Sequence, residues 1–355
     1  MQAAFFLQGV LTSLPAATVL LHLEALGYSI SMVSLVDGVI NLAWVFRWVF
    51  VSVPPVIGIG LGALTWLMLA LVPSPAQLYM FLSETAVAMH LTAIDRRGIT
   101  PEMARANLLG AVAGAYGGGF LNRLAGRQGV YLAETLVFLV LLLMRVGRMP
   151  EDHVAQMAAP RTPPSTAMKL FVTLATALPA ADTVLFFYYS DALGFTPQDF
   201  GVMDGLSATM ALAGTYLGRS TGLPVRYTLS TIFYYACVFA VLNRSFLGWD
   251  RFFVLVSLVP VNFYASALST QYAVDSGTEL PWLSAMSNVA RGAGLGASTA
   301  LTLAFDVNHN AYGNLVPMVF ACGTLSAALV MCAVCVPEPP RNTHGSSFAD
   351  AGDGP

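Results

Sequence analysis

The sequence predicts an all-α membrane protein with twelve transmembrane helices arranged as two parallel halves of six. Three observations support this fold class: the shortage of charge, the succession of apolar runs and an internal repeat. Of the 355 residues, 56% are hydrophobic and only 10% are charged, whereas a soluble domain carries roughly 25% charged residues. Lipid must therefore solvate most of the chain, and the composition excludes an ordinary soluble enzyme, a nucleic-acid-binding protein and a disordered scaffold.

Apolar runs long enough to cross a bilayer follow one another along the whole chain. A crossing needs about 20 mostly apolar residues, and such runs lie at 3–23, 32–50, 53–73, 76–94, 103–121, 130–147, 168–190, 199–218, 223–242, 252–272, 282–305 and 311–336. We expect a first six-helix bundle at 1–147, a proline-rich cytoplasmic linker at 148–167, a second bundle at 168–336 and a disordered cytoplasmic tail at 337–355. No basic leader precedes the first run, so we expect a first helix there rather than a signal peptide.

The cations predict the orientation, because cytoplasmic loops are enriched in Lys and Arg. With a cytoplasmic N-terminus, eleven of the 16 cations lie at cytoplasmic ends, and Arg291 falls inside a span. The remaining four, on the opposite side, are Arg123, Arg127, Arg244 and Arg251. We therefore expect both termini to be cytoplasmic, in a plasma membrane or a plastid envelope.

An internal repeat relates the two halves at a constant offset of 167 residues. An acid, a glycine, an aromatic residue, a hydroxyl residue and an Asp-Gly pair recur in register: Glu24, Gly27, Tyr28, Ser29 and Asp37-Gly38, then Asp191, Gly194, Phe195, Thr196 and Asp204-Gly205. With six spans per half, both copies enter the membrane from the same side. This is the arrangement of major facilitator transporters, which bind substrate near the midplane between the halves. A purely structural role, in which the repeat sets a turn and a helix start, competes with this interpretation.

Five charged side chains inside the expected spans are the first candidates for function. Each costs roughly 3 kcal/mol within the bilayer and usually faces the interior of a bundle. Glu84 and Asp182 lie near the middle of their spans, where they can contact substrate, carry a coupling proton or act as the fixed partner of Arg291. Asp37 and Asp204 lie nearer the helix ends and are expected to shape the gate between the halves.

Arg291 has two interpretations. It binds an anionic substrate, because a guanidinium matches a carboxylate with paired hydrogen bonds, or a nearby acid neutralises it and the pair holds helices together. The neighbouring Gly292, Gly294 and Gly296 are expected to let another helix approach closely.

Several motifs resemble the folate–biopterin transporter family. They are Phe6-Leu7-Gln8-Gly9, Leu26-Gly27-Tyr28-Ser29, Ala43-Trp44-Val45-Phe46-Arg47, Leu178-Pro179 with Phe186-Phe187-Tyr188, Leu193-Gly194-Phe195-Thr196-Pro197, Pro224-Val225-Arg226, Gly277-Thr278-Glu279 and Met286-Ser287-Asn288. Three positions depart from the family pattern: Ala43 and Arg47 replace its Pro and Lys, and Glu84 stands where its fourth helix carries aspartates. The chain therefore resembles a divergent member.

The resemblance implies a transporter that moves a folate-like or pterin-like anion by alternating access with coupled protons. It places Arg291, Glu84 and Asp182 in the substrate site, where Arg291 would bind the glutamyl carboxylate. Flat stacking faces would come from two aromatic runs, Phe186-Phe187-Tyr188-Tyr189 and Phe233-Tyr234-Tyr235, and from Tyr264 and Tyr272. Such rings also serve packing and lipid contact. Arg47 and Glu279 join Asp37 and Asp204 among the expected gating and coupling residues.

Other functions compete with this one. The chain has no nucleophile–base set, no phosphate-binding loop and no histidine spacing typical of a metal site, so we expect no catalysis, no cofactor and no metal. Its partners are expected to be a small-molecule substrate, protons and the lipid bilayer, and not nucleic acid. The alternatives are a transporter of another small metabolite and a degenerate carrier that serves as a structural subunit of a membrane complex.

Overall fold

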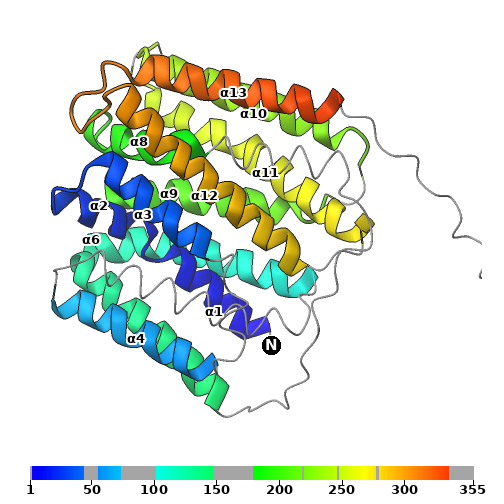
Figure 1. Ribbon diagram of the computed structural model, residues 1–355. Coiled ribbons are helices and arrows are strands. Elements are labelled where there is room, and N and C mark those ends of the chain that lie inside the picture. Colours follow the sequence, from blue (N-terminus) through cyan, green and yellow to red (C-terminus); the bar gives the residue numbers. More distant parts are fainter. Residues whose placement is uncertain are drawn as a thin grey trace, which may run out of the picture.

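The described residues of the computed structural model are almost entirely helical. They comprise residues 2–43, 55–72, 101–146, 179–217, 220–245, 248–276 and 280–335. The helices, shown in Figure 1, are α1 (Gln2–Ser13), α2 (Ala16–Ala25), α3 (Ile30–Ala43), α4 (Pro55–Leu71), α6 (Pro101–Val146), α8 (Pro179–Asp191), α9 (Pro197–Gly214), α10 (Leu223–Leu242), α11 (Asp250–Ser276), α12 (Leu280–Ala304) and α13 (Leu315–Cys335). One antiparallel bridge, between Asn308 and Ala311, closes the turn from α12 to α13.

Within this part of the chain, four stretches are long and apolar enough to cross a membrane by length and composition: Gln2–Ala25, Glu102–Met144, Leu223–Leu242 and Asp250–Gln271. Shorter apolar helices lie at Ile30–Leu42, Val56–Leu71 and Leu315–Ser326. Many large apolar side chains on these helices are exposed, among them Leu64, Leu136 and Leu303. Such an apolar exterior suits contact with lipid.

The helix bounds agree with the predicted runs wherever both are described, with two differences. The run at 3–23 divides at Leu14-Pro15 into α1 and α2, because Pro15 has no N–H to continue the helical ladder. The runs at 103–121 and 130–147 form two arms of α6, which doubles back at Gly126 (Figure 1), where φ is 65° and ψ is −172°. The run at 76–94, the linker at 148–167 and the tail at 337–355 lie outside the described residues, so the count of twelve and the domain boundaries stay predictions.

Glycines let α1 pack directly on α6. A Cβ added to Gly9 would meet the carbonyl oxygen of Asn107, and one added to Gly110 would meet the carbonyl oxygen of Phe6. Each glycine therefore lies against the backbone of the opposite helix, where no side chain fits. Small residues that bring backbones together in this way are typical of helix contacts in membranes.

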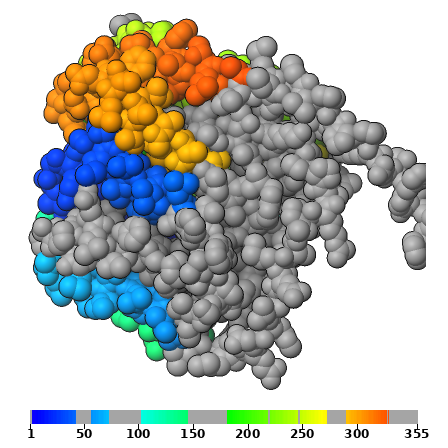
Figure 2. Space-filling view, in the orientation of Figure 1, coloured from blue at the N-terminus to red at the C-terminus, as the bar shows by residue number. Residues whose placement is uncertain are grey.

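Two helix pairs make the most extensive contacts between the segment before residue 146 and the segment after residue 179. They are α3 with α12 and α6 with α9, and Figure 2 shows the surface of the first helices directly against that of α12. Between α3 and α12, a Cβ on Gly292 would meet the carbonyl oxygen of Gly38 at 3.1 Å. Between α6 and α9, a Cβ on Gly119 would meet Cα of Gly201 at 3.1 Å. The expected close approach at Gly292 is thus present.

The two copies of the repeat adopt the same local structure. Gly27 and Gly194 both have positive φ, at 82° and 64°, and each follows the end of a helix. Left-handed backbone of this kind terminates helices and favours glycine. The hydroxyl residue then starts the next helix in both copies: Ser29 Oγ accepts from the Met32 N–H at 3.3 Å, and Thr196 forms a capping box with Asp199. The repeat therefore sets a turn and a helix start in both places.

Substituting Gly110 tests the backbone contact between α1 and α6. Gly110→Ala should lower the unfolding free energy by about 1–3 kcal/mol, as expected for overpacking, because the added methyl meets the Phe6 carbonyl. Thermal unfolding of the purified protein in detergent measures the change.

Gly117→Ala is the matched control in the same helix. A methyl there would meet only the Leu14 side chain, at 3.9 Å. Alanine is up to about 1 kcal/mol better than glycine within a helix, so this variant should be as stable as the parent or slightly more so. Equal melting temperatures for the two variants would show that α1 and α6 are not in backbone contact.

Candidate functional site

Four charged side chains predicted from the sequence come together as one electrostatic group. Asp37 lies on α3, Asp182 on α8, Asp204 on α9 and Arg291 on α12. Arg291 interacts electrostatically with Asp182 and with Asp204, and Asp182 interacts in addition with Asp37 and Asp204. We call these four residues the charge cluster. Its members come from both sides of the α3–α12 and α6–α9 contacts.

The side chains of Asp182 and Arg291 are exposed although their neighbours in the chain are buried. Ala181 and Thr183 flank Asp182, and Ala290 and Gly292 flank Arg291; all four are buried. Among the described residues, the Arg291 guanidinium makes no hydrogen bond and no ion pair within 4.0 Å. An accessible guanidinium that interacts with two acids at longer range, without a hydrogen bond to either, is available to a ligand.

The repeated Asp-Gly pair couples helix packing to the charge cluster. Gly38 places α3 against α12, with Cβ of Leu295 3.3 Å from the site of an added Cβ. Gly205 places α9 against the ring of Tyr116 on α6, at 2.6 Å by the same measure. In both copies the aspartate directly precedes the glycine that lies in the helix contact. Each close helix contact therefore positions one carboxylate in the charge cluster.

Asn41 supports Asp37 and was not singled out from the sequence. Its Nδ2 group donates to the backbone carbonyl oxygen of Asp37 at 2.8 Å and to Oδ1 of the same residue at 2.9 Å. The spacing of four residues on one helix was the available signal, because such residues share a face. The amide therefore orients the Asp37 carboxylate.

The structure places the predicted aromatic residues in two different surroundings. Tyr188 is buried and packs edge-to-face against Tyr312, with ring centres 5.3 Å apart, and Tyr264 lies edge-to-face on Phe263 at 5.2 Å. The rings that interact electrostatically with Asp182 belong to Tyr189, Tyr234 and Tyr235. The run at 233–235 therefore supplies two of the tyrosines beside the charge cluster.

A buried polar group lies within the first half of the chain. His22 Nδ1 is 2.9 Å from the hydroxyl of Tyr131, and the ring of Trp66 lies 5.4 Å from that of Tyr131. One turn away on α6, Glu134 is fully buried. Sequence reasoning missed Glu134, although a carboxylate inside the apolar run at 130–147 was itself a signal.

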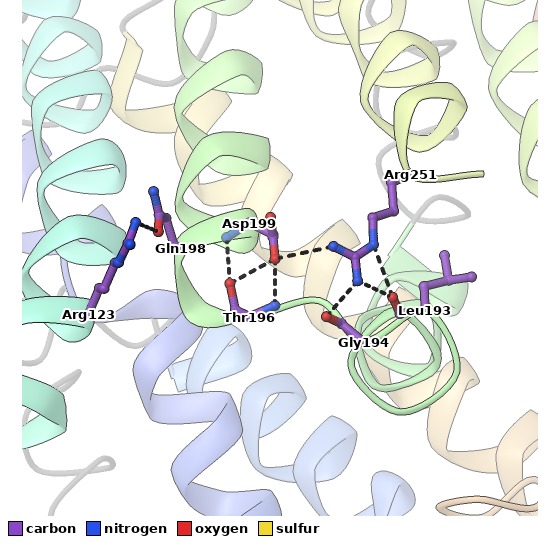
Figure 3. Close-up of polar contacts among 7 residues, drawn as sticks. All are labelled: Arg123, Leu193, Gly194, Thr196, Gln198, Asp199 and Arg251. Carbon is purple, nitrogen blue, oxygen red and sulfur yellow. Dashed lines mark hydrogen bonds and ion pairs between the residues drawn. The ribbon is translucent and has the colours of Figure 1, made fainter. Parts of the chain in front are cut away.

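Two arginines from neighbouring helices form hydrogen bonds with the turn between α8 and α9 and with the start of α9. Figure 3 shows Arg251 of α11 donating to the carbonyl oxygens of Leu193, at 2.6 and 3.0 Å, and Gly194, at 2.9 Å, while Asp199 lies 3.9 Å away. On the other side, Arg123 of α6 donates to the Gln198 side chain at 3.0 Å. These contacts hold the start of α9 between α11 and α6.

Three further predicted site residues, Arg47, Glu84 and Glu279, lie outside the described residues. Their assignment to substrate binding, gating and coupling stays a prediction.

Comparison with known proteins identifies the fold. No protein-family model matches the chain, and no curated protein matches its sequence. Among solved structures, the nucleoside transporter NupG is similar with a TM-score of 0.60 at 14% identity, over 94% of this chain and 97% of that one. A bacterial homologue of the human lysosomal transporter Spinster is similar in its inward-facing occupied form, with a TM-score of 0.56 at 13% identity, over 94% and 92% of the two chains. The chain shares the fold of these two transporters.

The same Spinster homologue in its unoccupied form gives a TM-score of 0.57 at 12% identity over the same shares of both chains. At these identities the likeness shows a shared fold and nothing about substrate. Together with the apolar helices, it makes the chain an integral, multi-pass membrane protein. Membership of the folate–biopterin family stays a prediction.

Cysteine labelling tests whether the charge cluster is reached by water. In a background without native cysteines, Asp182→Cys should react rapidly with a charged, membrane-impermeant methanethiosulfonate reagent, because the side chain at 182 is exposed. Thr183→Cys is the control, since the adjacent side chain is buried. Mass spectrometry of the labelled protein gives both rates. Similar rates at 182 and 183 would contradict an accessible charge cluster.

Proposed function

We propose that this protein is a secondary transporter that moves a small organic anion, of the folate or pterin class, across a membrane by alternating access with coupled protons. The charge cluster carries this proposal. A membrane protein retains charges inside its spans at a cost, and here four of them come from four different helices to one place. The resemblance of sequence motifs to folate–biopterin transporters supplies the substrate class.

The positions of the four helices suit alternating access. Asp37 and Arg291 directly precede Gly38 and Gly292, which meet in the α3–α12 contact, and Asp204 directly precedes Gly205, which meets α6. A change in the angle between the segments before 146 and after 179 would alter these two contacts together. Such rocking around a central site is the usual mechanism of transporters built from repeats, and both solved structures of the Spinster homologue are described as inward-facing.

Charge balance supports proton coupling. The charge cluster holds three carboxylates and one guanidinium, so with all four ionised it carries two excess negative charges. An organic anion that pairs with Arg291 would add to this excess, and close like charges repel strongly in a medium of low dielectric constant. Protons that bind with the anion remove the repulsion. We therefore assign the coupling protons to Asp182 and Asp204.

The tyrosines beside the charge cluster favour a substrate with a flat ring. Tyr189 and Tyr234 are buried within the helical core, and Tyr235 is half-buried, with its hydroxyl 3.3 Å from Ser326 Oγ. Flat aromatic faces stack on planar heterocycles. A pterin and a nucleoside share this feature, and NupG is named as a nucleoside transporter, so a nucleoside is the second candidate substrate.

The proposed topology places both termini in the cytoplasm. The end of the bundle that holds the turns at Gly27 and Gly194 and the turn at 305–314, here called the Gly27 end, then faces the opposite side of the membrane. Arg123 and Arg251 lie at this end, in agreement with the smaller group of cations.

Replacing the guanidinium tests substrate binding. Arg291→Gln should reduce uptake of labelled folate into proteoliposomes by about ten- to a hundredfold, the value of a charge-assisted hydrogen bond of roughly 1.5–3 kcal/mol. Arg226→Gln is the matched control, because Arg226 is exposed near the start of α10. Unchanged uptake with Arg291→Gln would exclude the proposed role.

The coupling protons are tested separately. Asp182→Asn and Asp204→Asn should retain exchange of labelled for unlabelled substrate but lose accumulation driven by an inward proton gradient, because exchange requires no net proton movement. Comparing the two assays in proteoliposomes measures the effect. Gradient-driven accumulation that survives in both variants would contradict proton coupling through these acids.

Competition experiments separate the candidate substrates and the non-transporting alternative. Excess folate, pterin, nucleoside or S-adenosylmethionine should each shift the melting temperature only if it binds. A stable stoichiometric protein partner in mild detergent, with no shift from any ligand, would favour the degenerate carrier that serves as a structural subunit.

A further inference from the structure

A second group of chemically active side chains lies at the Gly27 end of the bundle. Glu24 is in the last turn of α2, Asp191 ends α8, and His309 lies in the turn between α12 and α13. One ligating atom from each residue can be chosen so that all three lie within 4.8 Å of one another. Asp191 follows Asp182 by nine residues, about 13 Å along a helix, so this group is distinct from the charge cluster.

The hydrogen bond of one imidazole nitrogen determines the state of the other. His309 Nε2 is 3.0 Å from the backbone carbonyl oxygen of Tyr28. A carbonyl oxygen only accepts, so Nε2 carries a hydrogen and donates it. In the neutral ring Nδ1 then presents a lone pair. That atom is inaccessible to solvent and has no hydrogen-bond partner among the described residues.

Two carboxyl groups face this lone pair. Nδ1 lies 3.7 Å from Glu24 Oε1 and 3.6 Å from Asp191 Oδ2, which is too long for a hydrogen bond. Glu24 and Asp191 also interact directly with each other. The side chains are only 11–24% exposed. Three electron-pair donors therefore converge in a half-buried position, and a cation or a proton must lie among them to remove the repulsion.

The separations match those between ligands on one metal ion. Zinc binds nitrogen and carboxylate oxygen at about 2.0–2.2 Å, which in a tetrahedron puts ligand atoms about 3.4 Å apart. Mixed nitrogen and oxygen donors suit zinc, whereas Mg²⁺ and Ca²⁺ prefer oxygen alone. Three protein ligands also leave one position for water, as in open zinc sites.

The surrounding residues hold the three ligands in place. The Tyr312 hydroxyl donates to Asp191 Oδ2 at 2.6 Å, and the Asn310 N–H points to the same atom at 3.4 Å. A carboxylate oxygen only accepts, so the Tyr312 hydroxyl is the donor in this bond. The Phe187 ring lies edge-to-face on His309 at 4.8 Å. Histidine bonded to a backbone carbonyl and carboxylate held by a hydroxyl are the outer contacts that metal ligands typically make.

We propose that Glu24, Asp191 and His309 bind a divalent zinc-like cation that fastens the Gly27 end of the bundle. Glu24 belongs to the first copy of the repeat and Asp191 is its counterpart in the second, while His309 comes from the turn after α12. A bound ion ties α2 to α8 and to this turn. Any rocking motion that separates these elements must first break the coordination, so the ion holds this end closed.

Direct zinc binding tests the proposal without any transport assay. Equilibrium dialysis of the purified full-length protein with ZnCl₂ should show about one more bound ion per chain for the parent than for His309→Ala. Glu24→Gln and Asp191→Asn keep the side-chain volume and should lose the same ion. ZnCl₂ should also raise the melting temperature of the parent but not of these variants.

Asp306→Asn is the matched control, because Asp306 is an exposed acid in the same turn, 3.1 Å from the Asn308 amide. It should bind zinc like the parent. Equal zinc binding by the parent and all three ligand variants would overturn the proposal. So would a parent whose melting temperature responds to pH but not to zinc, since a proton alone would then occupy the site. Neither result depends on whether the protein transports folate.

Discussion

Lipid cannot solvate a charge, and this constraint organises the molecule from its composition to its site. Every charged side chain must lie at a membrane surface, meet an opposite charge or line a place that water or substrate can reach. In the proposed topology Arg123 and Arg251 lie at a membrane surface, where they donate hydrogen bonds to Gln198 and to the turn before α9. The charge cluster meets the other two conditions. Four helices bring Asp37, Asp182, Asp204 and Arg291 into one electrostatic group that contains opposite charges, and the Asp182 and Arg291 side chains are exposed.

Close helix packing makes that grouping possible. Gly38 lies against α12 and Gly205 lies against the Tyr116 ring. The aspartate before each glycine therefore lies beside the contact between the segments before residue 146 and after residue 179. The same unit therefore provides a crossing point and a carboxylate. A larger residue in place of either glycine would move the acid as well as the helix, which joins the stability of the fold to the chemistry of the site.

Much of the fold could be predicted because lipid demands long apolar runs and because the repeat recurs in register. The run at 223–242 matches α10 residue for residue, and the turns at Gly27 and Gly194 share positive φ, as their equivalent places in the repeat suggest. Asp182 and Arg291 could be predicted as candidate site residues because few charged residues lie within the apolar runs. Tyr188 shows the limit: its contact with the ring of Tyr312 depends on a distant part of the chain and could not be predicted from the aromatic run, and its expected stacking on substrate stays a prediction.

The sequence by itself determined the solvent, the helical class and the identity of the charges that need an explanation, because these depend on composition and on short-range spacing. Only the tertiary structure decided which of them meet. Glu24, Asp191 and His309 are separated by more than a hundred residues at each step, and no spacing along the chain relates His309 to the other two. Their convergence depends on how α2, α8 and the turn after α12 pack at one end of the bundle, and packing between distant helices is a property of the whole fold.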